Sequence, residues 1–183
     1  MRIVSGSHKG RRISPPKNLP VRPTTDMGKE SLFNILNNRM ELVDARGLDL
    51  FSGTGNISYE MGSRGFSDIT SVDADSGCIK FIRKTATEFE FPINAVQSNS
   101  FTFLDKTNSR YDLIFADPPY AMEQKDFDRL VNTVFERNLL DDDGLLVVEH
   151  SKYTKLELLP NYLFGRDYGG TFFSFFGLEE DQD

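Results

Sequence analysis

The residues with the clearest chemical potential form a short loop directly after an apolar segment, residues 111–116. They are Asp117, Pro118, Pro119 and Tyr120. The Asp117 carboxylate and the Pro118 carbonyl can each accept one hydrogen of an amine, and both prolines stiffen the loop because their φ angles are fixed. Tyr120 offers an aromatic face for stacking a base taken out of its helix or loop. The four residues therefore predict catalysis on an exocyclic base amine, whose delocalised lone pair must be drawn out of conjugation before it can be methylated.

A glycine-rich turn at residues 48–55 is the second candidate site. Gly53 and Gly55 would let the backbone approach a ligand at the start of a helix. The third glycine of the dinucleotide-binding fingerprint would fall at position 58, where the chain has Ser58. Asp49 lies just before the turn, where a carboxylate repels a pyrophosphate and attracts an ammonium. We therefore expect S-adenosylmethionine here, with its ammonium against Asp49 and its carboxylate against the helix amides.

Two later strand ends extend the expected cofactor site. Asp73 follows Asp49 by 24 residues, a position from which an acid commonly accepts hydrogen bonds from ribose hydroxyls. Asp75 could share that role, and Asp73 could alternatively only cap the next helix. Asn99 could offer both a donor and an acceptor to an adenine edge. The predicted cofactor-binding residues are therefore Asp49, Phe51, Gly53, Gly55, Asp73, Ala74, Asn99 and Ser100, and no metal site is expected.

The elements that must position these residues follow a repeating pattern. From Arg46 onward, apolar strand segments alternate with helical segments, which predicts a mostly parallel sheet covered on both faces. The expected strands are 47–51, 69–73, 93–97, 111–116 and 144–149, and the expected helices are 56–64, 76–88, 101–104 and 125–137. Residues 162–167 and 171–176 flank Gly169 and Gly170 and predict a closing antiparallel hairpin. The expected class is α/β, with the Rossmann-like sheet of class I S-adenosylmethionine methyltransferases.

The segment before this pattern is different. Residues 2–5 and 11–14 predict a small β-hairpin, and four prolines then exclude regular structure up to Thr24. Thr24 or Thr25 can cap a helix with apolar residues at helical spacing. We therefore expect a single domain, 1–183, made of an N-terminal extension (1–40), a core (41–178) and a disordered acidic tail (179–183).

Composition limits the class of protein further. The chain has 183 residues, a single cysteine (Cys78) and no apolar run near the ~20 residues that cross a bilayer. These features predict a cytoplasmic protein with no membrane partner, and nothing in them requires more than a monomer. Net charge is −7, but residues 1–25 carry +6, which leaves −13 for the remainder. Such segregation predicts a basic docking face for a nucleic acid, although a solvated basic tail is the simpler alternative.

The chain resembles the RsmD family of bacterial 16S rRNA guanine-N2 methyltransferases over nearly its whole length. The resemblance rests on several blocks that occur in order: 2–6 with 9–11, 22–26, 29–34, 48–55, 117–120 and 168–171. Arg22-Pro23-Thr24-Thr25-Asp26 is the most specific of them. The loop at 117–120 is shared with adenine-N6 DNA methyltransferases and does not by itself name the substrate.

The resemblance implies methylation of the N2 amine of a guanine in 16S rRNA, on the small ribosomal subunit or an assembly intermediate. It also implies that the N-terminal extension engages RNA, through Lys9, Arg11, Arg12, Arg22, Thr24 and Lys29. Three positions depart from the family pattern: Lys29 replaces a usual arginine, Asp73 a common glutamate and Asn99 a frequent aspartate. Lys29 keeps the charge but loses the bidentate fork of arginine.

Other functions stay open at this point. A DNA adenine-N6 methyltransferase would share the loop at 117–120 but would need a larger target-recognition region. A protein glutamine methyltransferase would have Asn in place of Asp117. An NAD oxidoreductase is disfavoured by Asp49, Ser58 and the closing hairpin. A non-catalytic RNA-binding module on the same fold is disfavoured by the intact acidic and aromatic residues of the loop.

Overall fold

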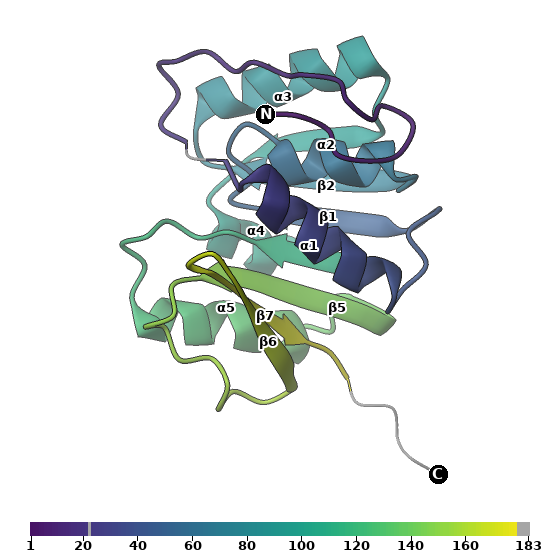
Figure 1. The fold of residues 1–183 in the computed structure, drawn as a ribbon. Coiled ribbons are helices and arrows are strands. Elements are labelled where there is room, and N and C mark those ends of the chain that lie inside the picture. Colours follow the sequence, from purple (N-terminus) through teal and green to yellow (C-terminus); the bar gives the residue numbers. More distant parts are fainter. Residues whose placement is uncertain (22, 179–183) are drawn as a thin grey trace.

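The computed structural model describes residues 1–21 and 23–178 and confirms the α/β class. Helices and strands alternate as the sequence predicts (Figure 1). The helices are α1 (Asp26–Asn37), α2 (Asn56–Ser63), α3 (Ser76–Phe89), α4 (Ser100–Lys106) and α5 (Gln124–Glu136). The strands are β1 (Arg46–Leu50), β2 (Asp68–Asp73), β3 (Ile93–Gln97), β4 (Tyr111–Ala116), β5 (Leu140–His150), β6 (Tyr162–Tyr168) and β7 (Thr171–Phe176).

Within the described residues, seven strands form one sheet in the order β3-β2-β1-β4-β5-β7-β6. The first five strands are mutually parallel, and β7 runs antiparallel to both β5 and β6. The chain moves outward from β1 through β2 to β3 and then crosses back to β4 on the other side of β1. This crossing makes β1 and β4 a topological switch point, where open α/β sheets bind ligands beyond the carboxyl ends of the strands.

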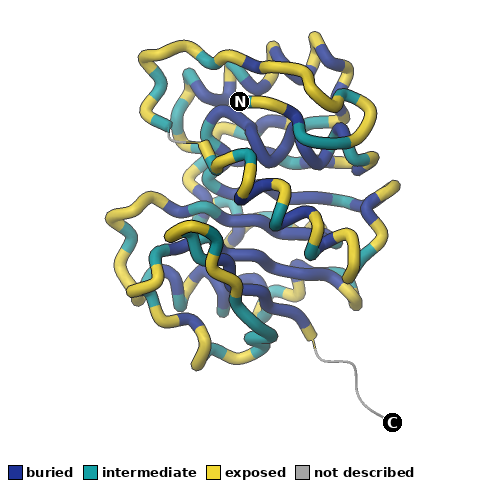
Figure 2. Tube along the Cα trace, in the orientation of Figure 1, coloured by how far each residue is buried: buried dark blue, intermediate teal, exposed yellow. Residues whose placement is uncertain are grey.

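Two helical layers cover the sheet (Figure 1). Helices α1 and α2 pack against one face through a buried cluster that includes Phe33, Met61 and Phe115. Helices α4 and α5 pack against the opposite face through Leu104, Leu130 and neighbouring strand residues. The central strands are buried along most of their length, and exposed residues follow the loops and the outer helix faces (Figure 2). The ends of β1 and β4, which carry Asp49 and lead to Asp117, are therefore held by buried strands, whereas β3, which leads to Asn99, is only partly buried.

The N-terminal extension is folded onto this core. The two segments of the predicted hairpin pair in antiparallel fashion, through a bridge between Arg2 and Arg12 and backbone hydrogen bonds such as Ile3 N–H to the Arg11 carbonyl, but they do not form regular strands. Ile3 and Ile13 are buried against α3 and Tyr59 of α2, which anchors the segment by apolar packing. The Glu60 carboxylate of α2 accepts the backbone N–H groups of Val4 and Ser5, which ties the segment to the helix. The predicted disorder of 179–183 concerns residues outside the described range.

Local capping explains where two helices begin. Thr25 caps α1 by accepting a hydrogen bond from the Gly28 amide at 3.1 Å. Asp75 caps α3 by accepting from the Cys78 amide at 2.8 Å. Asp73 is therefore not the cap of the following helix, and its carboxylate is placed at the strand end. No helix in the described part of the chain is long and apolar enough to cross a membrane.

Candidate active site

A cleft of about 850 Å³ lies at the switch point, beyond the carboxyl ends of β1 to β5. The N-terminal extension and the Gly169–Gly170 turn close its sides. It brings together predicted site residues from four strand ends, namely Asp49, Phe51, Gly53, Asp73, Ala74, Asn99, Ser100, Asp117, Pro118, Pro119 and Tyr120. Thr24 also lines it. Gly55, also predicted to bind the cofactor, does not line the cleft and is the N-cap residue of α2.

The turn between β1 and α2 has a special backbone. Phe51, Gly53 and Gly55 have φ angles of 54°, 54° and 90°, in the left-handed region. A Cβ atom at Gly55 would lie 2.6 Å from the Tyr59 ring, so both backbone angle and space require glycine. Phe51 takes the same region with a side chain, which costs free energy that surrounding contacts must supply. Its amide donates to Ser100 Oγ at 3.3 Å, so Ser100 holds the turn as well as lining the cleft.

Asp49 is buried beneath this turn, with 2% of its surface exposed. Ser58 Oγ donates to Asp49 Oδ2 at 2.6 Å, and Ser71 Oγ lies 2.6 Å from Ser58 Oγ. Burial raises the pKa of Asp49 to about 7, although the Ser58 hydrogen bonds partly oppose the shift. Sequence reasoning treated Ser58 only as a missing glycine. The structure shows that it orients the acid, a role that no local motif signals.

Asp73 and Asn99 make different contacts from each other. Asp73 accepts the Gly53 amide at 2.8 Å and the Asp75 amide at 2.9 Å, one on each oxygen, which leaves a lone pair on each oxygen for a ligand. Asn99 Oδ1 accepts the amides of Phe101 and Thr102 to cap α4. The expectation that Asn99 offers a ligand both donor and acceptor is therefore corrected: its acceptor is occupied, and its N–H groups remain.

Asp117 and Glu149 stand side by side at the ends of neighbouring parallel strands. Ala116 of β4 pairs with Val148 of β5, so the next residues on each strand share one face and one level of the sheet. Burial, then the Glu149 and Asp49 carboxylates, raise the pKa of Asp117 well above its ordinary range. Burial also raises the pKa of Glu149, opposed by a hydrogen bond from Thr24. Sequence reasoning gave Glu149 no role, although its position at a parallel strand end was a usable signal.

The lining of the cleft is acidic. Asp49, Asp73, Asp117 and Glu149 all contribute to it, and the described lining residues include no lysine or arginine. A pyrophosphate would meet repulsion there, whereas a ligand with an ammonium and a sulfonium would be attracted. In the described residues, no group of three or more His, Cys, Asp or Glu side chains is arranged to hold a metal ion.

Residues 1–177 match the model of the protein family described as "Conserved hypothetical protein 95". The chain is 36% identical over 161 residues to the putative rRNA methyltransferase YlbH of Bacillus subtilis, covering 85% of each chain. It is 30% identical to the ribosomal RNA small subunit methyltransferase D of Escherichia coli K12, covering 87% of this chain and 79% of that one. The chain belongs to the RsmD family.

Solved structures agree with this family assignment. The fold is similar to that of the putative methyltransferase yhhF from E. coli, with a TM-score of 0.84, 25% identity and coverage of 98% and 99% of the two chains. It also resembles the Thermus thermophilus 16S rRNA N2 G1207 methyltransferase RsmC in complex with AdoMet and guanosine, with a TM-score of 0.70 and 18% identity. That match covers 88% of this chain and 45% of RsmC, and it concerns the fold alone.

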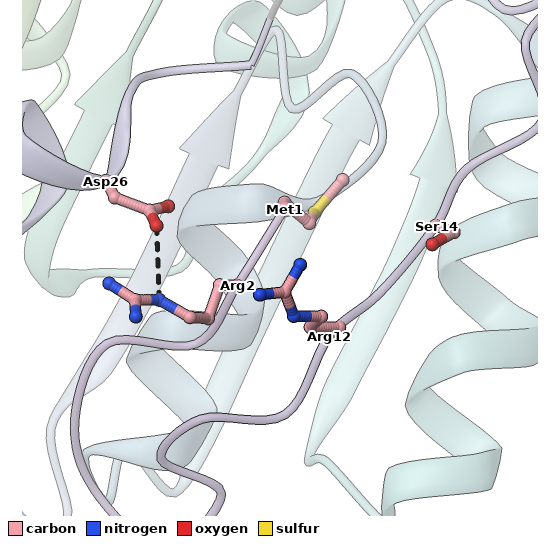
Figure 3. Close-up of a pocket in the computed structure, with 5 residues that line it drawn as sticks. All are labelled: Met1, Arg2, Arg12, Ser14 and Asp26. Carbon is pink, nitrogen blue, oxygen red and sulfur yellow. Dashed lines mark ion pairs between the residues drawn. The ribbon is translucent and has the colours of Figure 1, made fainter.

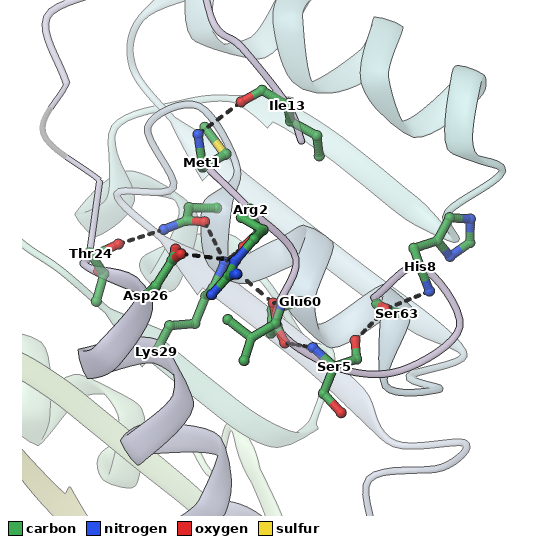
Figure 4. Close-up of polar contacts among 12 residues, drawn as sticks. Met1, Arg2, Ser5, His8, Ile13, Thr24, Asp26, Lys29, Glu60 and Ser63 are labelled. Carbon is green, nitrogen blue, oxygen red and sulfur yellow. Dashed lines mark hydrogen bonds and ion pairs between the residues drawn. The ribbon is translucent and has the colours of Figure 1, made fainter. Parts of the chain in front are cut away.

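In this RsmD-family chain, a polar network joins the N-terminal extension to the cleft, and Figure 4 shows its part around Thr24, Lys29 and Glu60. Thr24 Oγ1 donates to Glu149 Oε2 at 3.0 Å, and the Thr24 carbonyl accepts from Asn56 Nδ2 at 2.9 Å. Asn56 Oδ1 in turn accepts from Lys29 Nζ at 2.8 Å, and Lys29 pairs with Glu60. The network therefore fixes Thr24 at the cleft from the side of α2.

The position of Lys29 corrects its predicted role. Its side chain is fully buried and donates to the Arg2 carbonyl at 2.6 Å and to Asn56. Burial lowers the pKa of Lys29, although the Glu60 carboxylate opposes the shift. A cation enclosed in this way does not reach RNA. Its charge instead stabilises the Glu60 carboxylate that holds the extension.

Three further residues that the sequence predicts to contact RNA do not line the cleft. Lys9, Arg11 and Arg12 are exposed on the extension, and Arg12 lines a surface hollow of about 440 Å³ with Arg2 (Figure 3). Asp26 pairs with Arg2 at 3.2 Å at the rim of this hollow. The prediction for Arg22 concerns a residue outside the described range. Arg11 lies over the ring of Phe89, the last residue of α3, and Ser7 and His8 bond Ser63, the last residue of α2. Because both helices begin at the cleft, the cations near these contacts lie toward the opposite ends of the helices.

Proposed function

We propose that this protein transfers the methyl group of S-adenosylmethionine to the exocyclic N2 amine of a guanine in the 16S rRNA of the small ribosomal subunit. The observation that carries the proposal is the Asp117–Tyr120 loop at the switch point of an RsmD-family chain, beside an acidic cleft. Relatives with up to 36% identity are named rRNA methyltransferases. The protein acts as a single domain and as a monomer, in the cytoplasm, where ribosomal subunits assemble.

The residues present fit the cofactor. S-adenosylmethionine supplies a methyl group already activated by a sulfonium. Asp49, which Ser58 holds beneath the turn, is placed to pair with an ammonium. Asp73 keeps a free lone pair on each oxygen for two ribose hydroxyls. The free N–H groups of Asn99 suit a ring nitrogen of adenine, which is an acceptor.

The catalytic loop orients the acceptor amine. Asp117 accepts one hydrogen of the amine and the Pro118 carbonyl accepts the other, which turns the nitrogen lone pair toward the methyl group. Tyr120 is 94% exposed and can stack on the base. Holding the reacting atoms at near-attack distance contributes roughly 7–11 kcal/mol to the acceleration. The bound cofactor would supply the methyl group and keep the electron pair of the broken carbon–sulfur bond, and Asp117 or solvent would take the amine proton.

RNA engagement falls to the exposed part of the extension. Lys9, Arg11 and Arg12 supply charges for phosphates, together with Arg22 from the sequence. Thr24 is half-buried and acts at the cleft, and Lys29 acts inside the fold. The acidic remainder of the surface repels RNA from other orientations.

Labelled cofactor with small subunits from cells that lack this methylation tests the proposal. Digestion to nucleosides is expected to place the label in N2-methylguanosine, and Asp117→Ala is expected to give none. Label in N6-methyladenosine, or label only in added DNA, would contradict the proposal that the substrate is a guanine of 16S rRNA. Mapping the labelled nucleotide identifies the target position.

A further inference from the structure

The pair formed by Asp117 and Glu149 is not fully explained by binding the cofactor or orienting one amine. Both carboxylates line the cleft from adjacent strand ends, about 4.8 Å apart at the backbone by the ordinary strand spacing. Two carboxylates held this close repel each other and lose hydration. A ligand that donates hydrogen bonds to both of them would offset this cost. Such a ligand would donate several hydrogen bonds along one edge.

The hydrogen bonds at these two acids leave most of their acceptor capacity unused. Over residues 1–21 and 23–178, Thr24 is the only group that donates to the Glu149 carboxylate, and it contacts Oε2. Across the same residues nothing donates to the Asp117 carboxylate. Glu149 Oε1 and both Asp117 oxygens therefore remain as acceptors that face the cleft without a cation beside them.

A guanine matches these acceptors and an adenine does not. The Watson–Crick edge of guanine carries an N1–H donor next to the two N–H donors of the N2 amine. The same edge of adenine carries an acceptor at N1. A second carboxylate beside Asp117 would accept the N1–H of guanine but would repel the N1 lone pair of adenine.

We propose that Glu149 is the residue that selects guanine, by accepting its N1–H while Asp117 and the Pro118 carbonyl hold the N2 amine. Thr24 is a positioning residue in this arrangement, because its hydroxyl occupies Oε2 and turns Oε1 toward the base. Its carbonyl is fixed by Asn56, so the hydroxyl is held by the same network that anchors the extension. The inference rests on the proposed function and adds to it the chemical basis of base choice.

The test compares guanosine with 2-aminopurine riboside at the mapped target position. Both bases have the reacting 2-amino group, but 2-aminopurine has an acceptor at N1 in place of N1–H. Small subunits reconstituted from ligated rRNA carry one or the other nucleoside, and mass spectrometry measures the N2-methylated product. Wild-type protein is expected to prefer guanosine in kcat/KM by about 10- to 100-fold, the value of one good base-edge contact.

Glu149→Gln should reduce this preference at least tenfold, because the amide can donate to an N1 acceptor while its oxygen still accepts from Thr24. The loss on guanosine should appear mainly in KM, since the N1–H contact forms with the ground state as well as the transition state. Thr24→Val should shift the preference in the same direction but less, and Thr24→Ser should restore it. Glu136→Gln is the matched control, because Glu136 is exposed on α5 outside the cleft.

The possible outcomes distinguish a failure of the role assigned to Glu149 from a failure of the proposed methyltransferase function. An unchanged preference in a folded Glu149→Gln variant, or a wild-type protein that methylates both bases equally, would show that Glu149 does not read N1. Absence of N2-methylguanosine with the wild-type protein would instead overturn the proposed function and the inference together. Binding of free guanosine and 2-aminopurine riboside, measured by NMR, provides a second readout independent of turnover.

Discussion

Lys29 Nζ lies 3.3 Å from Glu60 Oε2, and neither side chain has any exposed surface. Glu60 also accepts the backbone amides of Val4 and Ser5 at 3.0 Å, and Arg64 Nε lies 3.0 Å from its other oxygen. One buried carboxylate therefore connects α1, α2 and the first residues of the chain. This arrangement makes the N-terminal extension part of the folded domain rather than a loose basic tail.

Replacing Lys29 by Met should destabilise the protein strongly. The substitution removes the fully buried one of the two cations that pair with Glu60, and breaking a buried ion pair typically costs about 3–5 kcal/mol. Because Arg64 remains beside Glu60, we expect the loss at the lower end of this range. Denaturant titration measures the loss, and limited proteolysis should show earlier cleavage in residues 1–14. The exposed pair Arg46–Asp68 is the control, because breaking it should cost at most about 1 kcal/mol. Equal effects at the two pairs would contradict the anchoring role.

Cofactor binding should weaken as the pH falls below about 7. Asp49 has a pKa raised by burial to about 7, and it must lose its proton to pair with an ammonium. Below that pH the dissociation constant of S-adenosylmethionine should rise about tenfold per pH unit, with one proton released on binding. Calorimetry in buffers of different ionisation enthalpy measures both quantities. Asp49→Asn should bind weakly at every pH, with this pH dependence lost.

The raised pKa of Asp49 should also affect the stability of the cofactor-free protein, but in the opposite direction: stability should fall, not rise, as the pH increases. A carboxyl whose folded pKa is raised contributes stability that is present below its unfolded pKa of 3.8 and is lost as the pH rises through about 7. Asp49→Asn should therefore gain stability relative to wild type at pH 8 and lose that advantage near pH 4. Thermal melts across this range check the sign, and a constant difference would argue against a buried, protonatable Asp49.

Asp117→Asn should lower kcat by roughly 10²–10³-fold, the usual effect of removing one oriented electrostatic partner of a reacting group. The dissociation constant of S-adenosylmethionine from the Asp117→Asn variant should stay within a few-fold of the wild-type value. The raised pKa of Asp117 should also place the acid limb of the kcat/KM profile above the range of an ordinary carboxyl. Single-turnover kinetics against pH measure both effects. Retained turnover in the variant would rule out the assigned role.

Changing Lys9, Arg11 and Arg12 together to Gln should weaken RNA binding and flatten its salt dependence. Each lost phosphate contact should reduce the slope of log K against log salt by about 0.7–0.9. Substitution is preferable to deletion, because Ile3 and Ile13 of this segment are part of the core. Lys106→Gln on α4 is the control, since it removes an exposed charge elsewhere. An unchanged slope in the triple variant would exclude this face as the RNA contact.

Much of the architecture follows from local sequence patterns. The alternation of strand and helix segments predicts the parallel sheet because buried strands read as short apolar runs. Asp49, Asp73 and Asp117 can be grouped from their positions in the sequence, since the carboxyl ends of parallel strands meet at one edge of the sheet. The closing hairpin is equally visible from its paired glycines.

Other features depend on contacts that no local pattern encodes. Thr24 and Glu149 are 125 residues apart in the chain, and Lys29 meets Glu60 only because α1 packs beside α2. Asn99 reads as a ligand contact in the sequence, but capping α4 occupies its acceptor. The sequence alone determined the fold class, because periodicity specifies it, and residue type predicts the chemistry of the 117–120 loop. Only the tertiary structure decided which acids face each other and which cation is buried, because those depend on how distant segments pack.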